Sequence, residues 1–570
     1  MKLLTRTTFP ELAQSLTSVG EHPLLAQLLT SRGVKSSQEL DLSLKHLIPP
    51  SHLKGQSEAA QLLANAIEMD KQICIVADYD CDGATACAVA ITGLELLGAK
   101  HVQYLVPDRV NDGYGLTPKI SQRVKDAQAQ VLITVDNGIA SIEGVQMAKQ
   151  LGLDVIITDH HLPGASLPLA DVIVNPNQAG CPFESKSLAG VGVMFYVLLA
   201  LRAELRTRDF FKKHQLEEPK LDQLLPLVAL GSIADVVSLD ANNRRLVHQG
   251  LERIKRGIMP VGLKALIEVC AKEPAQLSSQ DLGFSIGPRI NAAGRLSDMT
   301  LGIECLITKD ATQAQFLAQT LDLINKDRKS IELDMKEQAL EIAMSLADEN
   351  EDTPAALCIF DPDFHEGVIG IVASRVKDLY HRPTFVFANT SAQEKSHLLK
   401  GSGRSIPGFH LRDALDLISK RYPQLIVQFG GHAMAAGCSI EEDQLTLFEH
   451  AFEEVALELL SPEDLTQVVL VDGPLGQENC HVDIAKKIKS TVWGQGFLPP
   501  LFVDEFEVLE QRILGEQHLS LKLKLGQLLV DGIWFGRSER LKSKCSLAYK
   551  LEIDTWRGAE KVKLFIHSLA

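Results

Sequence analysis

Short apolar runs that alternate with helical stretches constrain the fold of this chain more than any other feature of its sequence. Five runs rich in β-branched residues lie between residues 73 and 174, namely Ile73–Ala77, Val102–Val106, Val131–Val135, Val155–Thr158 and Val172–Val174. Helical patterns separate most of them, notably at 83–97, 117–127 and 141–151. Strands that are apolar throughout and alternate with helices form parallel sheets covered on both faces. We therefore expect an α/β domain built on a parallel sheet.

The rest of the chain divides into further segments. At about 100–200 residues per domain, 570 residues suggest three or four domains. We predict an N-terminal helical segment at 1–55, the parallel-sheet domain at 56–310, a long connecting helix at 311–352, a second, smaller α/β domain at 353–460 and a C-terminal β domain at 465–570. Glycine-rich turns are expected at 401–403 and 430–431. The alternating runs after residue 465, including 468–471, predict a small antiparallel barrel or sandwich.

Composition excludes several classes of protein. With 45% hydrophobic and 23% charged residues, the chain is neither disordered nor fibrous. No apolar run approaches the roughly 18–20 residues that cross a bilayer, and the first residues lack a secretory-signal pattern. The 10 cysteines include no CxxC pair, which argues against a zinc ribbon and favours a reducing compartment. We expect a soluble, cytoplasmic protein.

Acidic side chains directly follow three of the predicted strands. The first strand leads into Asp78–Asp82, the third into Asp136 and the fourth into Asp159–His161. The carboxyl ends of parallel strands share one edge of the sheet, where ligands bind. Several carboxylates that close together repel one another unless cations hold them, and Asp oxygens with one or two imidazoles suit manganese or magnesium. The number of ligands predicts two ions, an arrangement typical of attack on phosphorus.

Two alternatives remain open for these acids. An Asp that follows a strand often caps the next helix, although three such strand ends make that explanation insufficient alone. Asp235 lies inside an apolar helical run, where it is either hydrogen-bonded in the core or a further metal ligand. The chain contains no GxGxxG, GxxxxGK[ST] or HExxH motif, so dinucleotide, ATP and metalloprotease chemistry have no support.

An ordered series of motifs resembles the DHH phosphoesterase superfamily. The strings are DYDCDGAT (78–85), VDNG (135–138), TDHH (158–161), ADVVSLD (234–240), GPRINAAGR (287–295), HEGVIGIVASR (365–375), GSGRS (401–405) and FGGHAMAAG (429–437). They span residues 70 to 440, and WGQGFLPPLF (493–502) continues the similarity into the C-terminal domain. The chain is most similar to the members that degrade single-stranded DNA. The resemblance implies a metal-dependent exonuclease that works 5′→3′, releases 5′-mononucleotides and acts in recombination and repair.

The resemblance also implies which residues bind metal and which take part in catalysis. Two Mn²⁺ or Mg²⁺ ions would be held by Asp80, Asp82, Asp136, His160 and Asp235, with Asp136 as the bridge and Asp78 as a ligand or a group behind the ligands. Many relatives carry a His where this chain has Val76, so Asp78 or water would complete that metal site. In catalysis, Asp136 would act together with Asp159, which orients the imidazoles, and His161, which faces the scissile phosphate.

A further set of residues is implied in binding the DNA backbone and its 5′ end. These residues are Arg109, Tyr114, Arg289, Asn291, Arg295, Ser374, Arg375, Arg404 and His432. Considered alone, a lone arginine is more often part of a surface salt bridge, and a glycine-rich segment is more often just a turn. Their assignment to DNA therefore depends on the resemblance.

The C-terminal domain carries its own signal for nucleic acid. The whole chain has a net charge of −16, yet residues 512–570 contain 11 Lys and Arg against 6 Asp and Glu. Trp534, Phe535, Tyr549 and Trp556 lie in the same stretch. Cations interleaved with aromatic rings suit a single strand, although we expect at least half of these rings to form the barrel core. This predicts an oligonucleotide-binding (OB) type of barrel.

Two other functions fit part of the sequence. A related hydrolase could act on pyrophosphate, cyclic dinucleotides or very short oligonucleotides, but it would not need the basic aromatic C-terminal domain. A DNA-binding scaffold without catalysis would not need the complete acidic set. The expected partners are single-stranded DNA, a helicase and a single-strand-binding protein that supply it, and no membrane.

Overall fold

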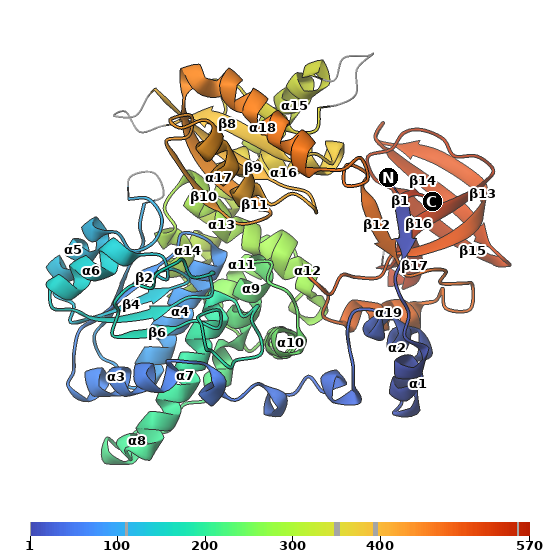
Figure 1. Cartoon of the computed structure of the whole chain (residues 1–570). Helices are drawn as coiled ribbons and strands as arrows, with labels where there is room; N and C mark the ends of the chain where they lie inside the picture. The colour runs from blue at the N-terminus through green and yellow to red at the C-terminus, as the bar shows by residue number, and fades with distance from the viewer. Residues whose placement is uncertain (1, 109–111, 347–353, 391–396, 556–557) are drawn as a thin grey trace.

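The computed structural model describes residues 2–108, 112–346, 354–390, 397–555 and 558–570. Figure 1 shows a parallel sheet at one side of the molecule, a second sheet above it and a barrel at the other side. The long helix α15 (Ala311–Leu346) joins the two sheet-containing domains. Within the described residues, no helix is both long and apolar enough to cross a membrane.

The first domain is built on a five-stranded parallel sheet, as predicted. Its strands are β2 (Ile73–Ala77), β3 (Val102–Leu105), β4 (Val131–Val135), β5 (Asp154–Thr158) and β6 (Val172–Val174), in the order β3-β2-β4-β5-β6. Helices α3 (Gln56–Glu68), α4 (Cys81–Leu96) and α7 (Gly190–Thr207) cover one face, and α5 (Pro118–Asp126) and α6 (Ile142–Gln150) cover the other. Because both faces are buried, the strands read as continuous apolar runs.

Further helices complete this domain (Figure 1). They are α8 (Phe210–Lys213), α9 (Leu225–Ala234), α10 (Ala241–Lys255), α11 (Val261–Val269), α12 (Ser279–Asp281), the π-helix η6 (Leu282–Ile286), α13 (Gly287–Leu296) and α14 (Thr300–Ile307). Helix α15 packs on α11, α13 and α14 and, further along, on α16 of the second domain. The helix predicted at 311–352 corresponds to α15, and residues 347–352 lie outside the described residues.

The second domain carries a mixed sheet with the order β10-β11-β9-β8-β7. Its elements are β7 (Leu357–Phe360), α16 (Ile369–Tyr380), β8 (Thr384–Asn389), β9 (Leu398–Arg404), α17 (Leu411–Arg421), β10 (Gln428–Gly431), β11 (Ala435–Glu441) and α18 (Leu445–Leu459). Only β7 and β8 pair in parallel, and the other pairs are antiparallel.

The prediction of glycine-rich turns at 401–403 and 430–431 is wrong. Residues 401–403 lie inside strand β9 and 430–431 inside β10. A Cβ at Gly401 would lie 2.4 Å from the ring of Phe387, and one at Gly403 would lie 2.6 Å from the ring of Phe385. The glycines therefore make room for buried rings on the neighbouring strand β8, a role that local turn statistics do not reveal.

The C-terminal domain is a closed five-stranded barrel in the order β13-β14-β15-β17-β16. It contains β13 (Phe502–Leu514), β14 (His518–Leu525), β15 (Leu528–Trp534), β16 (Lys544–Asp554) and β17 (Lys561–Leu569), and α19 (Val482–Ser490) precedes it. The barrel is predicted correctly, but β15 and β17 pair in parallel, so it is not purely antiparallel.

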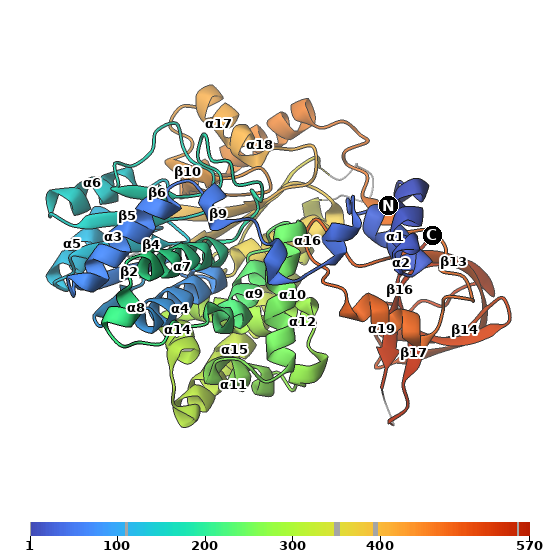
Figure 2. The same ribbon diagram turned by 90° about the horizontal axis from the view of Figure 1, so that it is seen from below.

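Two further expectations are corrected at the ends of the chain. Strand β12 (Val468–Val471) lies outside the barrel and pairs in parallel with β1 (Lys2–Thr5). The N-terminal segment is therefore not wholly helical: β1 precedes α1 (Pro10–Ser18), α2 (Pro23–Thr30) and three 3₁₀ turns before residue 55. In Figures 1 and 2 helices α1 and α2 lie beside the barrel. A pairing between residues so far apart in sequence leaves no local signal.

The segment between α19 and β13 fastens the barrel to the first domain. Trp493 and Phe497 stack with ring centroids 5.4 Å apart, and both are buried. Ser279 Oγ donates to the Trp493 carbonyl at 2.7 Å, and Leu239 N donates to the Gln495 carbonyl at 2.8 Å. Residues of the barrel, of this segment and of the first domain consequently share one hydrophobic core.

Candidate metal centre

The acidic strand ends meet at one edge of the parallel sheet. Strand β4 pairs with β2 on one side and with β5 on the other, so the residues that follow the three strands are neighbours. Asp78, Asp136 and Asp159 are all nearly inaccessible to solvent. This is the convergence that the sequence predicted, and it follows from the strand order rather than from sequence spacing.

The loop after β2 caps helix α4 and also contributes carboxylates to the acidic cluster. Asp80 caps α4, and its Oδ1 accepts a hydrogen bond of 2.9 Å from Gly83 N. Gly83 is needed because a Cβ there would lie 2.6 Å from the Asp78 carbonyl oxygen. Asp78 Oδ1 accepts from Tyr79 N at 2.7 Å. The capping alternative therefore holds for Asp80, but it does not exclude a role in the cluster.

The loop after β4 holds Asp136 in an unusual backbone conformation. Its φ is +61°, and its N–H donates to the Thr158 carbonyl at 3.0 Å. The Asn137 amide donates to the carbonyls of Val76 and Val135, which ties the ends of β2 and β4 together. A Cβ at Gly190 would lie 2.5 Å from Asp136 Oδ1. The glycine therefore keeps the space around this carboxylate open.

Asp82 and Asp235 reach the cluster from helix ends. Asp82 accepts hydrogen bonds of 2.7 and 3.0 Å from the N–H groups of Gly190 and Val191, at the start of α7, where the helix dipole favours an anion. Asp235 ends α9, and its Oδ2 lies 3.4 Å from His160 Nε2. Of the two readings left open for Asp235, the structure places it at the cluster instead of in the apolar core.

Three groups of ligand atoms lie close enough to hold ions, each within 4.8 Å of one another. They are Asp78 with Asp80 and Asp136, Asp82 with His160 and Asp235, and Asp136 with His160 and His161. Asp136 and His160 each belong to two groups, but only a carboxylate has two oxygens with which to bridge neighbouring ions, so Asp136 is the candidate bridge. The Val76 side chain has no ligand atom, and Asp78 supplies an oxygen to the group at the end of β2.

Burial and mutual repulsion raise the pKa of the clustered carboxyl groups. Burial, followed by the charge of Asp80, raises the pKa of Asp78 to about 8 and that of Asp82 to about 7. Burial also raises the pKa of Asp136 and Asp235 well above the usual range, and the charges of Asp82 and Asp80 add to this shift. Bound cations offset such charges and restore the ionised form.

The chemistry of the donor set fits divalent cations. Asp136 Oδ1 and His160 Nε2 lie 3.1 Å apart, and both are buried without a hydrogen-bond partner. Burial, followed by the proximity of His161, lowers the pKa of His160 to about 4, so its imidazole is neutral at pH 7 and able to bind a metal. Buried polar atoms without partners are rare in proteins, and an ion between these two atoms would satisfy both.

His161 forms an ion pair with Asp159. The Nδ1–Oδ1 distance is 2.7 Å, and Asp159 also accepts from the backbone N–H groups of Ile139, His160 and His161. Burial by itself would lower the pKa of His161, but the Asp159 hydrogen bond and charge raise it to about 9. His161 is therefore a cation at neutral pH.

Two further rings close around His161. Tyr114 Oη lies 3.5 Å from His161 Nε2, and the Tyr114 ring meets that of Tyr79 edge-on at 6.0 Å. His432 stacks almost parallel to His161, with centroids 6.3 Å apart and 15° between the planes. Because His432 lies in the hairpin between β10 and β11, the second domain reaches the acidic cluster of the first.

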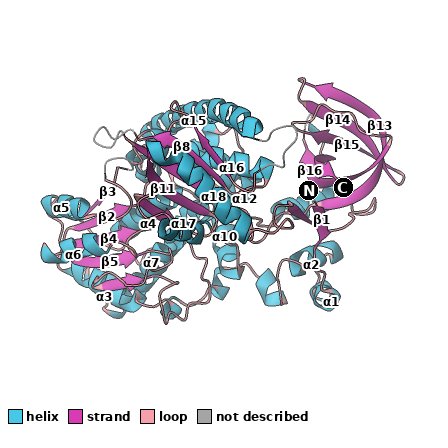
Figure 3. Cartoon of the chain, turned by 45° about the horizontal axis from the view of Figure 1, so that its top comes forward, coloured by secondary structure: helices cyan, strands magenta, loops and turns pink. Residues whose placement is uncertain are grey.

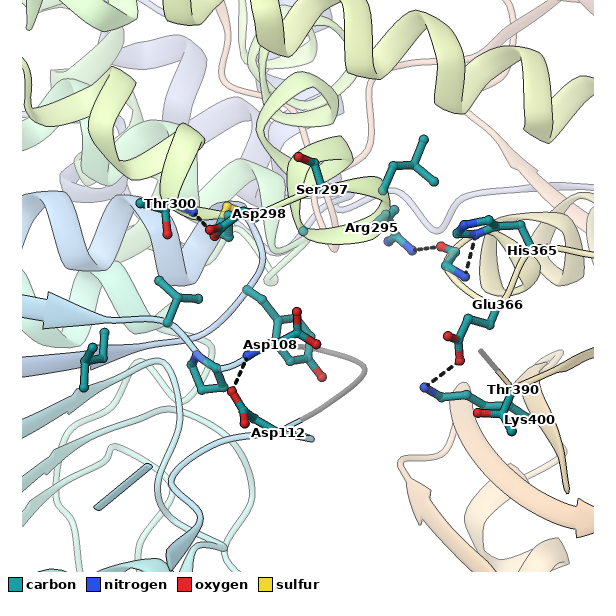
Figure 4. Close-up of a pocket in the computed structure, with 18 of the residues that line it drawn as sticks. Asp108, Asp112, Arg295, Ser297, Asp298, Thr300, His365, Glu366, Thr390 and Lys400 are labelled. Carbon is teal, nitrogen blue, oxygen red and sulfur yellow. Dashed lines mark hydrogen bonds and ion pairs between the residues drawn. The ribbon is translucent and has the colours of Figure 1, made fainter. Parts of the chain in front are cut away.

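A cavity of about 720 Å³ lies between the two domains beside the cluster. Tyr79, Asp108 and Arg295 line it from the first domain, and His365–Gly367 and Lys400 line it from the second (Figure 4). In Figure 4, Arg295 contacts the second domain through its bond of 3.2 Å to the Gly367 carbonyl. This cleft is large enough for part of a nucleotide chain. Figure 3 shows the two sheets, one in each of the domains that line it.

The nine residues predicted to contact DNA fall into different environments. Tyr114 and His432 adjoin His161, and Arg295 lines the cleft. Asn291 Oδ1 accepts from Cys81 N at 2.8 Å, and Arg404 donates to the Gly403 carbonyl and Ser402 Oγ. Tyr114, Asn291, Arg295 and His432 are therefore near the cluster or the cleft, whereas Arg404 bonds within its own strand, and the role of all five in binding DNA stays a prediction.

The other four predicted DNA contacts receive less support. Arg289 bonds to Asp322, and Arg375 to Glu332, both on α15, with N–O distances of 2.8 and 3.0 Å. Ser374 donates to the Gly370 carbonyl within its own helix. A phosphate would have to compete with these partners. Arg109 lies outside the described residues.

Several residues of the site were not predicted from sequence. The ion pair of Glu366 with Lys400 (3.2 Å) lines the cleft, although the HEG string that contains Glu366 was among the motifs noted. Asn137 donates to the Val76 and Val135 carbonyls at the ends of β2 and β4, and Gly190 leaves room for the Asp136 carboxylate. No spacing rule links Gly190 to Asp136, so only the tertiary structure could reveal that contact.

Comparison with known families matches this architecture domain by domain. The DHH family N-terminal domain matches residues 72–232, the DHHA1 domain residues 351–458 and the RecJ OB domain residues 471–568. A parallel-sheet domain with clustered Asp and His, followed by these two domains, defines a DHH phosphoesterase with a C-terminal OB barrel. That combination narrows the class to nucleases of the RecJ type.

Individual relatives make the assignment specific. The single-stranded-DNA-specific exonuclease RecJ of Salmonella typhimurium is 45% identical over 96% of both chains, and that of Escherichia coli K12 is 44% identical over the same shares. RecJ of Thermus thermophilus in complex with Mn²⁺ superposes with a TM-score of 0.82 and 29% identity, covering 100% of this chain and 79% of that one. The chain belongs to the RecJ family of single-stranded-DNA-specific exonucleases.

Proposed function

We propose that this protein is a metal-dependent exonuclease that degrades single-stranded DNA from its 5′ end and releases 5′-mononucleotides. The observation that carries the proposal is the buried pair Asp136 Oδ1 and His160 Nε2, 3.1 Å apart and without hydrogen-bond partners, inside a ring of carboxylates. Its relatives are named single-stranded-DNA-specific exonucleases, and a structural neighbour is described in complex with Mn²⁺. A role in recombination and repair follows from the family.

Two divalent ions, Mn²⁺ or Mg²⁺, are the proposed cofactors. Asp78, Asp80 and Asp136 would hold one, and Asp82, His160 and Asp235 the other, with Asp136 able to serve both. When bound, such ions lower the pKa of an attacking water and neutralise charge on the phosphate. This chain's own contribution is to keep His160 neutral and the carboxylates converged.

His161 is the proposed stabiliser of charge on the scissile phosphate. Its cationic form is maintained by Asp159, which also fixes the ring through Nδ1 and leaves Nε2 toward Tyr114. A fixed cation beside a phosphate that gains negative charge lowers the barrier without any reorganisation at the moment of reaction. His432 limits the space on the other side of the ring.

The cleft and the barrel are the proposed binding surfaces for the strand. The cleft at Arg295 would hold the 5′ end close to the metal cluster, which determines direction. On the barrel, Phe535 is 54% exposed and meets His518 and Phe565 at 5.2 and 5.6 Å. Exposed rings on a basic OB barrel offer stacking surfaces for successive bases.

The predicted division of the barrel aromatics between core and surface agrees with this proposal. Trp534 and Tyr549 are buried, and Tyr549 Oη donates to Asp504 at 2.7 Å, so these two rings serve the core. Phe535 remains at the surface, and Trp556 lies outside the described residues. Among the described residues, the exposed aromatic platform consists of Phe535, Phe565 and His518, and Trp534 does not belong to it.

The partners and location follow from the substrate. Genomic DNA is double-stranded, so we propose that a helicase exposes the strand and that a single-strand-binding protein covers it before digestion. Both would act with this enzyme where the DNA is, in the cytoplasm.

The deciding experiment is digestion of a 5′-labelled and a 3′-labelled single strand with Mn²⁺, with Mg²⁺ and with EDTA. A 5′ label should appear at once as a mononucleotide, while a 3′ label should pass through a ladder of shortening strands, and EDTA should stop both. Degradation that persists after exhaustive chelation, or a ladder from the 5′ label, contradicts the proposal. Duplex DNA of the same sequence is the control and should remain intact.

A further inference from the structure

The turn at residues 494–496 lies against the chain on both sides of Asp235. A Cβ at Gly494 would lie 2.6 Å from the Leu239 side chain and 3.7 Å from that of Ile233. Ile233 precedes Asp235 by two residues, and Leu239 follows it by four. A segment from the C-terminal part of the chain therefore contacts the residues just before and just after a carboxylate of the acidic cluster.

A hydrogen bond and a second glycine keep the two backbones close. Leu239 N donates to the Gln495 carbonyl at 2.8 Å. Gly496 has a φ of +69°, in the left-handed region that favours glycine, and a Cβ there would lie 2.3 Å from Ser238 Oγ. A larger residue at 494 or 496 would push the turn away from residues 238 and 239, so the contact depends on glycine at both positions.

The aromatic residues on either side of this turn make it rigid. Trp493 and Phe497 stack on each other. The Arg32 guanidinium lies 5.3 Å from the ring centroid of Trp493, and that of Arg244 lies 4.3 Å from the centroid of Phe497. Arg32 is itself fixed by two bonds, of 2.7 and 2.8 Å, to the buried carboxylate of Asp472. Because cation–π contacts gain strength when they are desolvated, the turn is a firm support for the loop that rests on it.

The loop that follows Asp235 is strained and is held at its far end. Val236 has a φ of +60°, which a β-branched residue disfavours. Its side chain is 60% exposed, so packing of that side chain does not impose the conformation. Leu239 is bonded to the turn, and Asp240 caps α10 by accepting from Asn243 N at 2.9 Å. Strain of this kind persists only where the surroundings impose it, and the fixed end of the loop supplies that constraint.

The Asp235 carboxylate depends on this backbone for its position. Asp82 is fixed by hydrogen bonds from the N–H groups of Gly190 and Val191. Within the part of the chain that the structure describes, no hydrogen bond fixes the Asp235 carboxylate, whose Oδ2 lies 3.4 Å from His160 Nε2. Such a side chain stays in place only as well as its backbone does, and contacts behind metal ligands tune metal affinity.

We propose that the turn at residues 493–497 is a positioning element for Asp235 and completes the proposed ion site at Asp82, His160 and Asp235. The inference rests on the proposed function and adds to it the residues that hold one of the metal ligands. All three ligands belong to the first domain, yet Asp235 is held in place from the C-terminal part of the chain. Because the same segment fastens the barrel, docking of the barrel and completion of the metal site are coupled.

The test is Gly494→Ala in the full-length protein, because the added methyl group would push Leu239 and the loop behind Asp235. In a Mn²⁺ titration followed by electron paramagnetic resonance, one of the two ions should bind at least about tenfold more weakly and the other as in the wild type. At limiting Mn²⁺, kcat should fall, and saturating Mn²⁺ should restore it with an unchanged KM for DNA. Gly496→Ala, at the exposed Ser238, is the milder variant and decides if Gly494→Ala does not fold.

A double variant shows whether the effect acts through Asp235. Asp235→Asn should weaken the same ion, and Gly494→Ala added to Asp235→Asn should cause no further loss of Mn²⁺ affinity. The matched control is Gly93→Ala, whose Cβ would lie 2.3 Å from another buried leucine, Leu198, near the end of α4 opposite Asp82. It should lower Tm to a similar extent and bind both ions as the wild type does.

Three results overturn the proposal. The first is wild-type affinity for both ions in Gly494→Ala and in Gly496→Ala. The second is an equal loss of Mn²⁺ affinity in Gly93→Ala, since the loss would then follow from general destabilisation. The third is a further loss when Gly494→Ala is added to Asp235→Asn. If the wild-type protein itself binds no Mn²⁺, the proposed function fails first, and the two failures are distinguishable.

Discussion

At the scale of single residues, the site depends on a few buried polar atoms whose partners are missing from the protein itself. Asp136 Oδ1 and His160 Nε2 stand in contact without a hydrogen bond, among carboxyl groups whose pKa is raised by burial. Asp82 and Asp159, by contrast, are fully bonded to backbone N–H groups. The backbone bonds fix the positions of these two carboxylates, and the pair without partners is the clearest mark of an ion site.

Asp136→Asn should remove most metal binding and activity. The amide cannot carry the negative charge that a cation needs, so we expect Mn²⁺ affinity and turnover each to fall by more than about 100-fold. Titration of Mn²⁺ monitored by calorimetry measures the first and digestion of labelled DNA the second. Asp154→Asn, at the opposite end of β5, is the matched control and should bind Mn²⁺ as the wild type does. Intact Mn²⁺ binding in Asp136→Asn would exclude a central role.

Asp159→Asn should shift the pH dependence of hydrolysis. The pKa of His161 is raised to about 9, so the proton that the reaction needs is held below pH 9 and lost above it. Without the Asp159 charge, burial dominates and the pKa falls. Each unit of that fall costs about tenfold in protonated His161 on the alkaline side.

The pH–rate profile measures this effect. Activity of Asp159→Asn at pH 8 should drop at least about tenfold against the wild type, and part of it should return near pH 6. His161→Gln should show no such recovery at low pH. An Asp159→Asn profile parallel to that of the wild type would mean that His161 does not act as a cation.

At the scale of elements, all strands of the parallel sheet could be predicted from sequence, whereas the glycine-rich strands of the mixed sheet could not. The apolar runs of β2, β4 and β6 coincide with the predicted strands because both faces of that sheet are buried. Strand β9, LLKGSGR, has glycine at alternate positions and resembles a loop. Its glycines leave room for the rings of Phe385 and Phe387 on β8, and this contact between strands has no local sequence signal.

Gly401→Ala should therefore destabilise the second domain. The new Cβ would lie 2.4 Å from the ring of Phe387, and overpacking of this kind costs about 1–3 kcal/mol. Gly437→Ala, on the paired strand β11, is the control, because its nearest atom outside the residue would be 3.5 Å away. Denaturant unfolding of both variants measures the difference, and equal stabilities would refute the packing argument.

At the scale of the whole molecule, the barrel is not an independent appendage. The segment Trp493–Phe497 bonds to Leu239 and Ser279, close in sequence to Asp235 and to η6. A truncation after residue 465 removes this buried segment together with the barrel. A loss of DNA binding in that variant could therefore not be told apart from destabilisation of the first domain. Substitutions on the barrel surface separate these effects.

Phe535→Ala combined with Phe565→Ala should weaken the binding of long strands selectively. Base stacking contributes about 1–3 kcal/mol per base, so KM for long single strands should rise roughly 5- to 100-fold. Trinucleotides, too short to reach both the barrel and the cleft, should be hydrolysed at the wild-type rate. Leu529→Ala, an exposed residue of the same barrel, is the control. Equal effects on long and short substrates would contradict a role for the barrel platform.

The sequence by itself determined the parallel sheet, the barrel and the identity of the acids at the strand ends. Those features depend on local patterns: buried strands are apolar throughout, and each strand end is followed at once by its functional side chains. The ordered motifs indicate its superfamily without reference to the fold.

Only the tertiary structure decided what each of those side chains contacts. It paired Lys2–Thr5 with Val468–Val471, bound Arg289 and Arg375 to acids of α15, and set Gly190 against Asp136. It also left Val236 strained and exposed beside Asp235. Such contacts join residues that are distant in sequence, and their free energy depends on distance and burial in space, which no local pattern records.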